Sequence, residues 1–128
     1  MPESRNNVGI KKVLVVEDEP RVRRYSCRVF NSLGYHVLEA ENARQAMDML
    51  MDDHNDIHLV FSDIIMPGDN NGRDLAEHVQ ANYPHIEVML TSGFEKTLAG
   101  EAQDKDNHFP VLKKPYSKKE LESALEKL

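Results

Sequence analysis

Five short apolar runs, each followed by a segment of helical periodicity, constrain the fold of this chain more than any other feature. The runs cover residues 13–16, 35–40, 57–63, 86–91 and 109–112. Short apolar runs that give way to turn-forming residues are typical of buried strands. Strands that alternate with helices in this way form right-handed βαβ units and a parallel sheet covered on both faces. The sequence therefore predicts an α/β fold of five strands and five helices.

Local signals mark where several of these helices begin. They are Pro20, which suits a first helical position, and the capping-box patterns Asn42–Gln45 and Ser117–Glu120. Met47 and Met51 stand four residues apart and share a helix face, so we expect both to pack in the core. Residues 94–107 give the weakest helical pattern, because a glycine and a charged run interrupt it. We expect only a short or frayed helix there.

Composition and charge disfavour several classes of protein. The chain has 128 residues, 40% of them apolar and 30% charged, which suits one globular domain. Residues 1–11 are expected to form a flexible tail and residues 12–128 the folded domain. A net charge of −6 disfavours nucleic acid as a partner, and no apolar run reaches the roughly 20 residues that span a membrane. The single cysteine, Cys27, indicates a reducing compartment, so we expect a cytoplasmic protein without a membrane partner.

Polar side chains that could do chemistry stand at the carboxyl ends of four of the five predicted strands. They are Glu17 and Asp18 at the end of the first strand, Asp63 at the end of the third, Thr91 at the end of the fourth and Lys114 at the end of the fifth. Because the carboxyl ends of parallel strands meet at one edge of the sheet, we expect these groups to converge. Clustered carboxylates raise one another's pKa unless a cation neutralises them. The sequence therefore predicts a cation site around Asp63.

Magnesium suits this set of oxygen donors. Mg²⁺ prefers octahedral oxygen ligands, keeps several waters and takes only one or two carboxylates. The expected ligands are Asp18 and Asp63 directly, Glu17 through water, and the backbone carbonyl of Ile65. A carboxylate beside Mg²⁺ and a lysine is poised for phosphoryl transfer, in which the metal and Lys114 neutralise charge on the phosphoryl oxygens. Thr91 could then hydrogen-bond a phosphoryl oxygen of the product.

Four motifs together resemble the receiver domain of two-component response regulators. They are VLVVEDEP at residues 13–20, SDIIMPG at 62–68, LTSG at 90–93 and Lys114–Pro115. They stand in the family's order, and the resemblance covers nearly the whole chain from Lys12 onward. It implies a flavodoxin-like, doubly wound sheet with strand order 2-1-3-4-5. The long loop at 66–72 and the sequence TSGF at 91–94 are most similar to receivers of hybrid sensor histidine kinases.

The resemblance also implies a role for each site residue. Asp63 would accept a phosphoryl group from a histidine kinase or a histidine phosphotransfer domain. The implied roles of the others are Mg²⁺ binding for Glu17 and Asp18, the switch hydroxyl for Thr91, and the phosphoryl-binding ammonium for Lys114, whose bond to Pro115 would be cis. Phosphorylation would switch the binding of an output protein or a fused kinase. The domain would then catalyse only its own phosphorylation and dephosphorylation.

Val111 marks a departure from the family, and Ile65 bears on a rival function. Val111 stands three residues before the lysine, where the family often has an aromatic residue, so the usual aromatic readout is not expected. An Mg²⁺-dependent aspartyl phosphatase needs a second carboxylate two residues after its nucleophile, and that position is Ile65. The other alternative is a receiver-like module that binds partners without phosphorylation. The complete set of acids, threonine and lysine disfavours that alternative.

Overall fold

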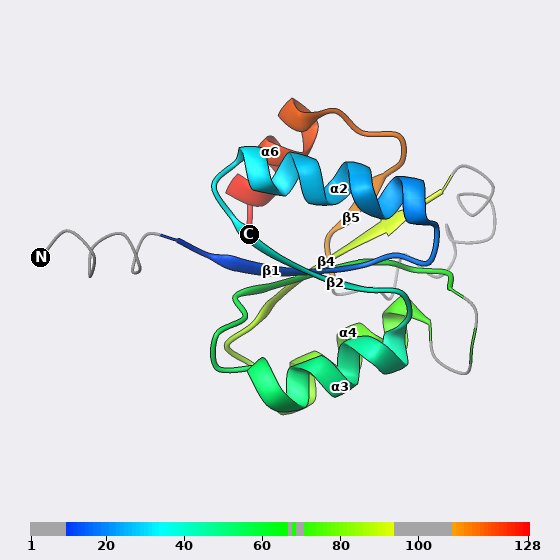
Figure 1. Cartoon of the computed structure of the whole chain (residues 1–128), viewed down its shortest axis with the longest axis vertical. Helices are drawn as coiled ribbons and strands as arrows, with labels where there is room; N and C mark the ends of the chain where they lie inside the picture. The colour runs from blue at the N-terminus through cyan, green and yellow to red at the C-terminus, as the bar shows by residue number, and fades with distance from the viewer. Residues whose placement is uncertain (1–9, 67, 69–70, 94–108) are drawn as a thin grey trace, which may run out of the picture.

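A computed structural model, which describes residues 10–66, 68, 71–93 and 109–128, confirms the predicted parallel sheet (Figure 1). Its strands are β1 (Lys12–Val16), β2 (His36–Ala40), β3 (Leu59–Asp63), β4 (Glu87–Ser92) and β5 (Val111–Lys113). They lie in the order β2-β1-β3-β4-β5, and each neighbouring pair is parallel. This is the strand order that the resemblance to receiver domains implies, so the predicted fold class is confirmed.

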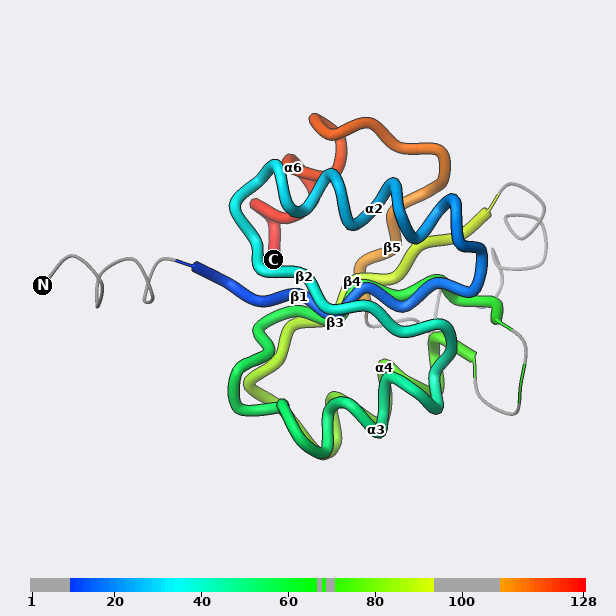
Figure 2. The backbone as a smooth tube through the Cα atoms, in the orientation of Figure 1, coloured from blue at the N-terminus to red at the C-terminus, as the bar shows by residue number. Residues whose placement is uncertain are grey.

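Two helices of the described residues cover each face of the sheet, as the backbone trace in Figure 2 also shows. On one face lie α2 (Pro20–Ser32) and α6 (Lys118–Glu126), and on the other α3 (Ala43–Asp53) and α4 (Gly72–Asn82). The fifth helix expected over residues 94–107 lies outside the described residues, and so do residues 1–9 of the expected tail. Within the described part of the chain, no helix has both the length and the apolar character of a membrane span.

Alternate residues of the central strands enter two separate cores. In β1, Val13 and Val15 pack with α2 and α6, whereas Leu14 and Val16 pack with α3 and α4. All four are at most 1% exposed. Successive side chains of a strand point to opposite faces, so a strand covered on both faces is apolar at every position. This explains the continuous apolar runs of the sequence.

The capping signals place most helix starts correctly. Pro20 is the first residue of α2, and Ser117–Glu120 forms a complete capping box at α6. At α3 the capping box is only half formed, and the expectation is wrong in this detail. The side chain of Asn42 accepts from Gln45 N at 2.7 Å, but the Gln45 side chain accepts instead from the amide of Glu41. The glutamine therefore bonds the amide one residue before the cap.

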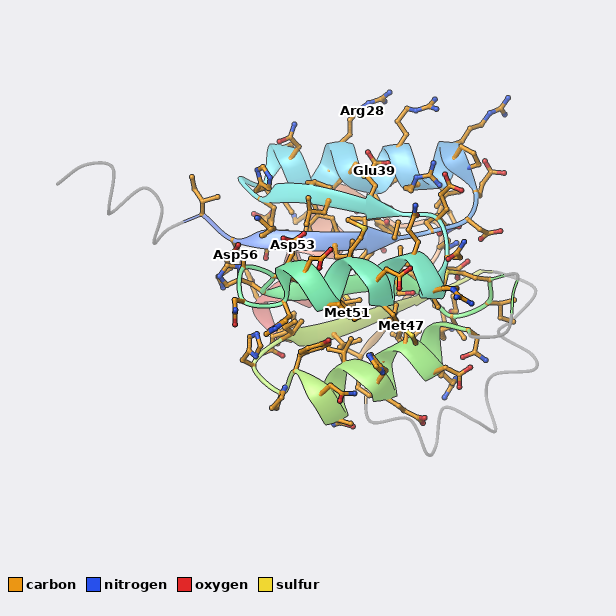
Figure 3. All side chains as sticks on the ribbon, turned by 60° about the horizontal axis from the view of Figure 1, so that its bottom comes forward. Arg28, Glu39, Met47, Met51, Asp53 and Asp56 are labelled. Atoms are coloured by element: carbon orange, nitrogen blue, oxygen red, sulfur yellow. The ribbon has the colours of Figure 1, made fainter. Side chains whose placement is uncertain are left out.

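The outer face of α3 differs from the expectation in one residue. Met47 packs against the core on the α3 and α4 side of the sheet. Met51, four residues on, is 69% exposed (Figure 3). The prediction that both methionines pack in the core is thus right for Met47 and wrong for Met51. Sharing a helix face therefore does not ensure that both side chains are buried.

Gly72, the first residue of α4, lies against the backbone at the end of β3. A Cβ atom added at Gly72 would lie 2.1 Å from the carbonyl oxygen of Asp63 and 2.8 Å from Cα of Ile64. The close approach lets Gly72 N donate a hydrogen bond to the carbonyl of Ile64 at 2.6 Å. Asn71 and Asp74 form a capping box around this point, which the sequence analysis did not identify. Helix α4 therefore begins directly behind the strand end that carries Asp63.

We expect Gly72→Ala to lower the free energy of unfolding by about 3 kcal/mol, because the atoms it meets are backbone and cannot turn away. Urea unfolding measures the change. Gly34→Ala is the matched control: Gly34 has a φ of 94° with nothing within 4 Å of an added Cβ, so only the left-handed backbone penalty of about 1 kcal/mol applies. Equal losses in the two variants would contradict the close approach at Gly72.

Candidate functional site

The strand register places the predicted site residues on one face of the sheet, at the carboxyl ends of the strands. Val15, Phe61 and Met89 pair across β1, β3 and β4, and Leu112 pairs with Thr91. All four core residues belong to or pack against the core under α2 and α6. The site residues Glu17, Asp63, Thr91 and Lys114 each follow one of them by two positions. Because side chains alternate with period two, the site residues share the α2 and α6 face.

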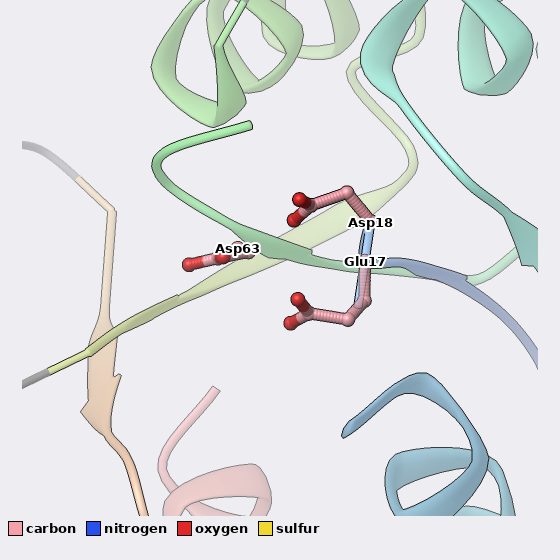
Figure 4. Close-up of side chains that lie close together, drawn as sticks. All are labelled: Glu17, Asp18 and Asp63. Atoms are coloured by element: carbon pink, nitrogen blue, oxygen red, sulfur yellow. The ribbon is translucent and has the colours of Figure 1, made fainter. Parts of the chain in front are cut away.

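Three carboxylates converge at this edge, as the sequence predicts. One oxygen each from Glu17, Asp18 and Asp63 can be chosen so that all lie within 4.8 Å of one another. Figure 4 shows the three side chains pointing the same way, beyond the ends of the strands. Glu17 and Asp63 are each only 4% exposed, whereas Asp18 is exposed. The cluster thus has a buried side and a side open to solvent.

Lys114 supplies a positive charge to this cluster. Its Nζ donates to Glu17 Oε1 at 2.9 Å and lies 3.3 Å from Asp63 Oδ2. The lysine is held at its base because its main-chain amide donates to the carbonyl of Ser92 on β4 at 2.8 Å. The Lys114–Pro115 bond is cis, which confirms the expectation. One ammonium thus bridges two of the three carboxylates.

The surroundings of Glu17 and Lys114 shift the pKa values of both side chains upward. Burial raises the pKa of Glu17, and the nearby charge of Asp63 raises it further, so the hydrogen bond from Lys114 does not restore the ordinary value. Burial acts to lower the pKa of Lys114, but its contacts with Glu17 and Asp63 outweigh this and leave the pKa raised. The lysine therefore stays charged near neutral pH. A single ammonium leaves the acidic cluster short of positive charge.

Arg23 holds the backbone of the turn that carries Glu17 and Asp18, and the sequence analysis did not identify this role. Its Nη1 donates to the main-chain carbonyl of Glu17 at 2.8 Å, and its Nε donates to Glu39 at 3.1 Å. The arginine lies in the first turn of α2, shortly after Pro20. A basic residue in the first turn of a helix that follows an acidic strand end is the sequence signal that could have indicated this contact.

The remaining site residues lie where the strand ends predict them. Thr91 is 2% exposed and pairs with Asp63 in the parallel register of β3 and β4. Its carbonyl accepts from the amide of Ile64 at 2.9 Å, which ties the two strand ends together. Ile65 follows β3 and is 49% exposed. The role of its backbone carbonyl as a metal ligand stays a prediction, and residues 67, 69 and 70 of the following loop lie outside the described residues.

Comparisons with known proteins identify relatives of this chain. The family model described as the response regulator receiver domain matches residues 13–126. The sensor kinase CckA of Brucella abortus is 30% identical over 120 residues, which are 94% of this chain and 13% of that kinase. The response regulator receiver protein CpdR of the same organism is 28% identical over 93% of this chain and 97% of its own. The chain thus spans a small part of the kinase and nearly all of CpdR.

Two solved structures of receiver domains have the same fold as this chain. The crystal structure of the receiver domain from the hybrid histidine kinase CckA superimposes with a TM-score of 0.72 at 28% identity. The match covers 91% of this chain and 96% of that one. A response regulator receiver domain from Clostridium thermocellum matches with a TM-score of 0.79 at 24% identity, covering 91% of this chain and 92% of that one.

The raised pKa of Glu17 generates a pH-dependent prediction. Above the folded-state pKa the buried carboxylate is charged in both states and its desolvation destabilises the fold, whereas below the ordinary value of 4.5 it is protonated in both states and has no such effect. We expect Glu17→Gln to raise the free energy of unfolding by about 1 kcal/mol at pH 7 in a metal chelator. The gain should disappear as the pH falls below 4.5.

Thermal and urea unfolding at both pH values test this sign. Glu126→Gln, at an exposed position of α6, is the matched control and should change stability little at either pH. A loss of stability in Glu17→Gln at pH 7 would show that the ion pair with Lys114 outweighs the burial of the carboxylate.

Proposed function

This chain belongs to the response regulator receiver domain family of two-component systems, and on that premise we propose that Asp63 is its phosphoacceptor. The observation that supports this role is the position of the Asp63 carboxylate. It is buried at a strand end, 3.3 Å from a lysine ammonium and beside two further carboxylates. An acid in this position is both shielded from bulk water and placed next to the charges that stabilise a transferred phosphoryl group.

In the proposed reaction, a carboxylate oxygen of Asp63 attacks the phosphorus of a phosphohistidine on a partner. The bond from that oxygen to phosphorus forms while the phosphorus–nitrogen bond to the imidazole breaks in line. The imidazole keeps the electron pair of the broken bond and takes a proton from solvent. The products are an acyl phosphate on Asp63 and a neutral histidine on the donor.

The acidic cluster fits an Mg²⁺ ion that would support this step. The three carboxylates offer oxygens that lie within 4.8 Å of one another, and the exposed side at Asp18 leaves room for the waters that Mg²⁺ keeps. The proposed ligands are Asp18 and Asp63 directly, Glu17 through water, and the Ile65 carbonyl. When bound, Mg²⁺ would neutralise charge on the phosphoryl oxygens.

Lys114 and Thr91 are proposed to bind the phosphoryl group and so to distinguish the phosphorylated from the unphosphorylated state. A phosphoryl group on Asp63 offers three oxygens to which the Lys114 ammonium can transfer its hydrogen bonds from the carboxylates. Thr91 lies in register with Asp63 and could donate its hydroxyl to another of these oxygens. Moving a two-state switch from mostly off to mostly on requires about 5 kcal/mol of differential stabilisation. A few charge-assisted hydrogen bonds are of this size.

The proposed partner is a histidine kinase or a histidine phosphotransfer domain, and the proposed location is the cytoplasm. Phosphorylation would then change the binding of an output protein or of a fused kinase. Receiver domains are phosphoacceptors rather than conventional enzymes. We infer no turnover of external phosphoesters here, because the position two residues after Asp63, where an aspartyl phosphatase has its second carboxylate, is the apolar Ile65.

We expect Asp63→Asn to abolish phosphorylation by acetyl phosphate in the presence of Mg²⁺, because the amide cannot form the acyl phosphate. Intact-protein mass spectrometry would show the mass of one phosphoryl group added to the unaltered protein and none added to the variant. Asp56→Asn is the matched control, since Asp56 is exposed near the opposite end of the sheet, and it should be labelled normally. Undiminished labelling of Asp63→Asn would refute the assignment.

Removing the exposed acid should weaken metal binding. We expect Asp18→Asn to lower Mg²⁺ affinity at least about tenfold, which is about 1.4 kcal/mol, because a direct charged ligand becomes a neutral one. Isothermal titration calorimetry with Mg²⁺ alone measures the change, and Asp56→Asn again serves as the control. An Mg²⁺ affinity equal to that of the unaltered protein would show that Asp18 is not a metal ligand.

A further inference from the structure

The segment that carries Lys114 is attached to α2 by the residue two positions later, Tyr116. This tyrosine is 6% exposed, and its hydroxyl shares a hydrogen bond with the hydroxyl of Ser26 on α2, which is 2% exposed. Burial raises the pKa of Tyr116 to about 12, so its hydroxyl stays protonated at ordinary pH. The contact is therefore a buried, uncharged bond between the lysine segment and the helix.

A second bond from α2 reaches the same residue at its backbone. The hydroxyl of Tyr25 donates to the main-chain carbonyl of Tyr116 at 2.6 Å, and the two rings lie 5.6 Å apart. Tyr25 itself is 40% exposed. Its ring packs against the ring of Tyr116, and its hydroxyl bonds to the main chain of the same residue. Side chain and backbone of Tyr116 are thus each held by neighbouring residues of one helix.

The third contact joins Tyr116 to the strand that carries the phosphoacceptor. The rings of Tyr116 and Phe61 lie 5.8 Å apart in an edge-to-face arrangement at 83°. Phe61 is two residues before Asp63 on the same face of β3. Tyr116 therefore packs between α2 and β3, two residues after the lysine that contacts Asp63.

We propose that Tyr25 and Tyr116 are positioning residues that fix the base of Lys114 so that its ammonium meets the phosphoryl group on Asp63. This inference rests on the proposed function of Asp63. A lysine side chain has four rotatable bonds and loses considerable rotamer freedom when it is held in one place. Fixing its backbone on both sides reduces the number of positions that the ammonium can reach. The Ser92 carbonyl holds the lysine itself, and the tyrosine contacts hold the residue that follows Pro115.

Beryllofluoride with Mg²⁺, a mimic of the phosphoryl group, tests the proposal without turnover. We expect Tyr25→Phe to lower beryllofluoride affinity about five- to tenfold, the net value of a typical hydrogen bond, without lowering the affinity for Mg²⁺ alone. The split is expected because the tyrosine acts on the phosphoryl-binding lysine and not on the metal ligands. A general loss of structure would reduce both affinities. Tyr116→Phe should behave in the same way.

Two controls separate positioning from other effects. Tyr35→Phe removes the same hydroxyl from a half-buried tyrosine that packs on Phe30, and it should bind beryllofluoride normally. In a Lys114→Met background, Tyr25→Phe should cause no further loss, because the group that it positions is absent. An additional loss of the same size in that background would overturn the proposal.

The outcomes distinguish this inference from the function on which it rests. If the unaltered protein binds no beryllofluoride and is not labelled at Asp63, the proposed function is wrong and the inference fails with it. If the unaltered protein binds and both Tyr25→Phe and Tyr116→Phe bind equally well, the inference alone is wrong. Should Tyr116→Phe fail to fold, Tyr25→Phe decides, since its ring is part-exposed and only a hydroxyl is removed.

Discussion

The ammonium of Lys114, shared between Glu17 and Asp63, is the interaction on which the rest of this site depends. Three carboxylates meet at the sheet edge, and two of them are almost fully buried. Buried carboxylates without a counter-charge would be strongly destabilising or protonated. The lysine lowers this penalty without removing it, as the raised pKa of Glu17 shows. The folded chain therefore keeps an excess of negative charge where a divalent cation fits.

The sheet makes this strained arrangement possible because its interior is apolar on both faces. Core residues fill the middle of β1, β3 and β4, and the polar residues Asp63 and Thr91 stand at the carboxyl ends of their strands. The stability of the two cores can thus offset a site that is unfavourable by itself. Proteins commonly place their local violations of folding rules at functional sites. Here the buried carboxylates lie at one edge of the sheet.

Most of the fold could be predicted from the sequence because its signals are local. Apolar runs, helical spacing and caps such as Pro20 act over a few residues, and the strand ends then name Asp63 and Lys114 as site residues. The contact between Lys114 and Glu17 joins residues 97 positions apart, and no local pattern specifies its geometry. The same holds for the bond from Arg23 to the carbonyl of Glu17. The misplaced bond of Gln45 and the exposure of Met51 have the opposite cause, since local patterns predicted contacts that the surroundings did not provide.

Helix α2 connects the two halves of the site in a way that neither half shows alone. Near its start, Arg23 holds the carbonyl of Glu17 and thereby the acidic turn. One helical turn away, Tyr25 and Ser26 hold Tyr116 and thereby the lysine segment. Because a helix moves nearly as a rigid body, a shift of α2 would displace both sets of groups together. Under the proposed function, a phosphoryl group on Asp63 that drew Lys114 away from Glu17 would act on both attachments, and α2 would then respond to the state of Asp63.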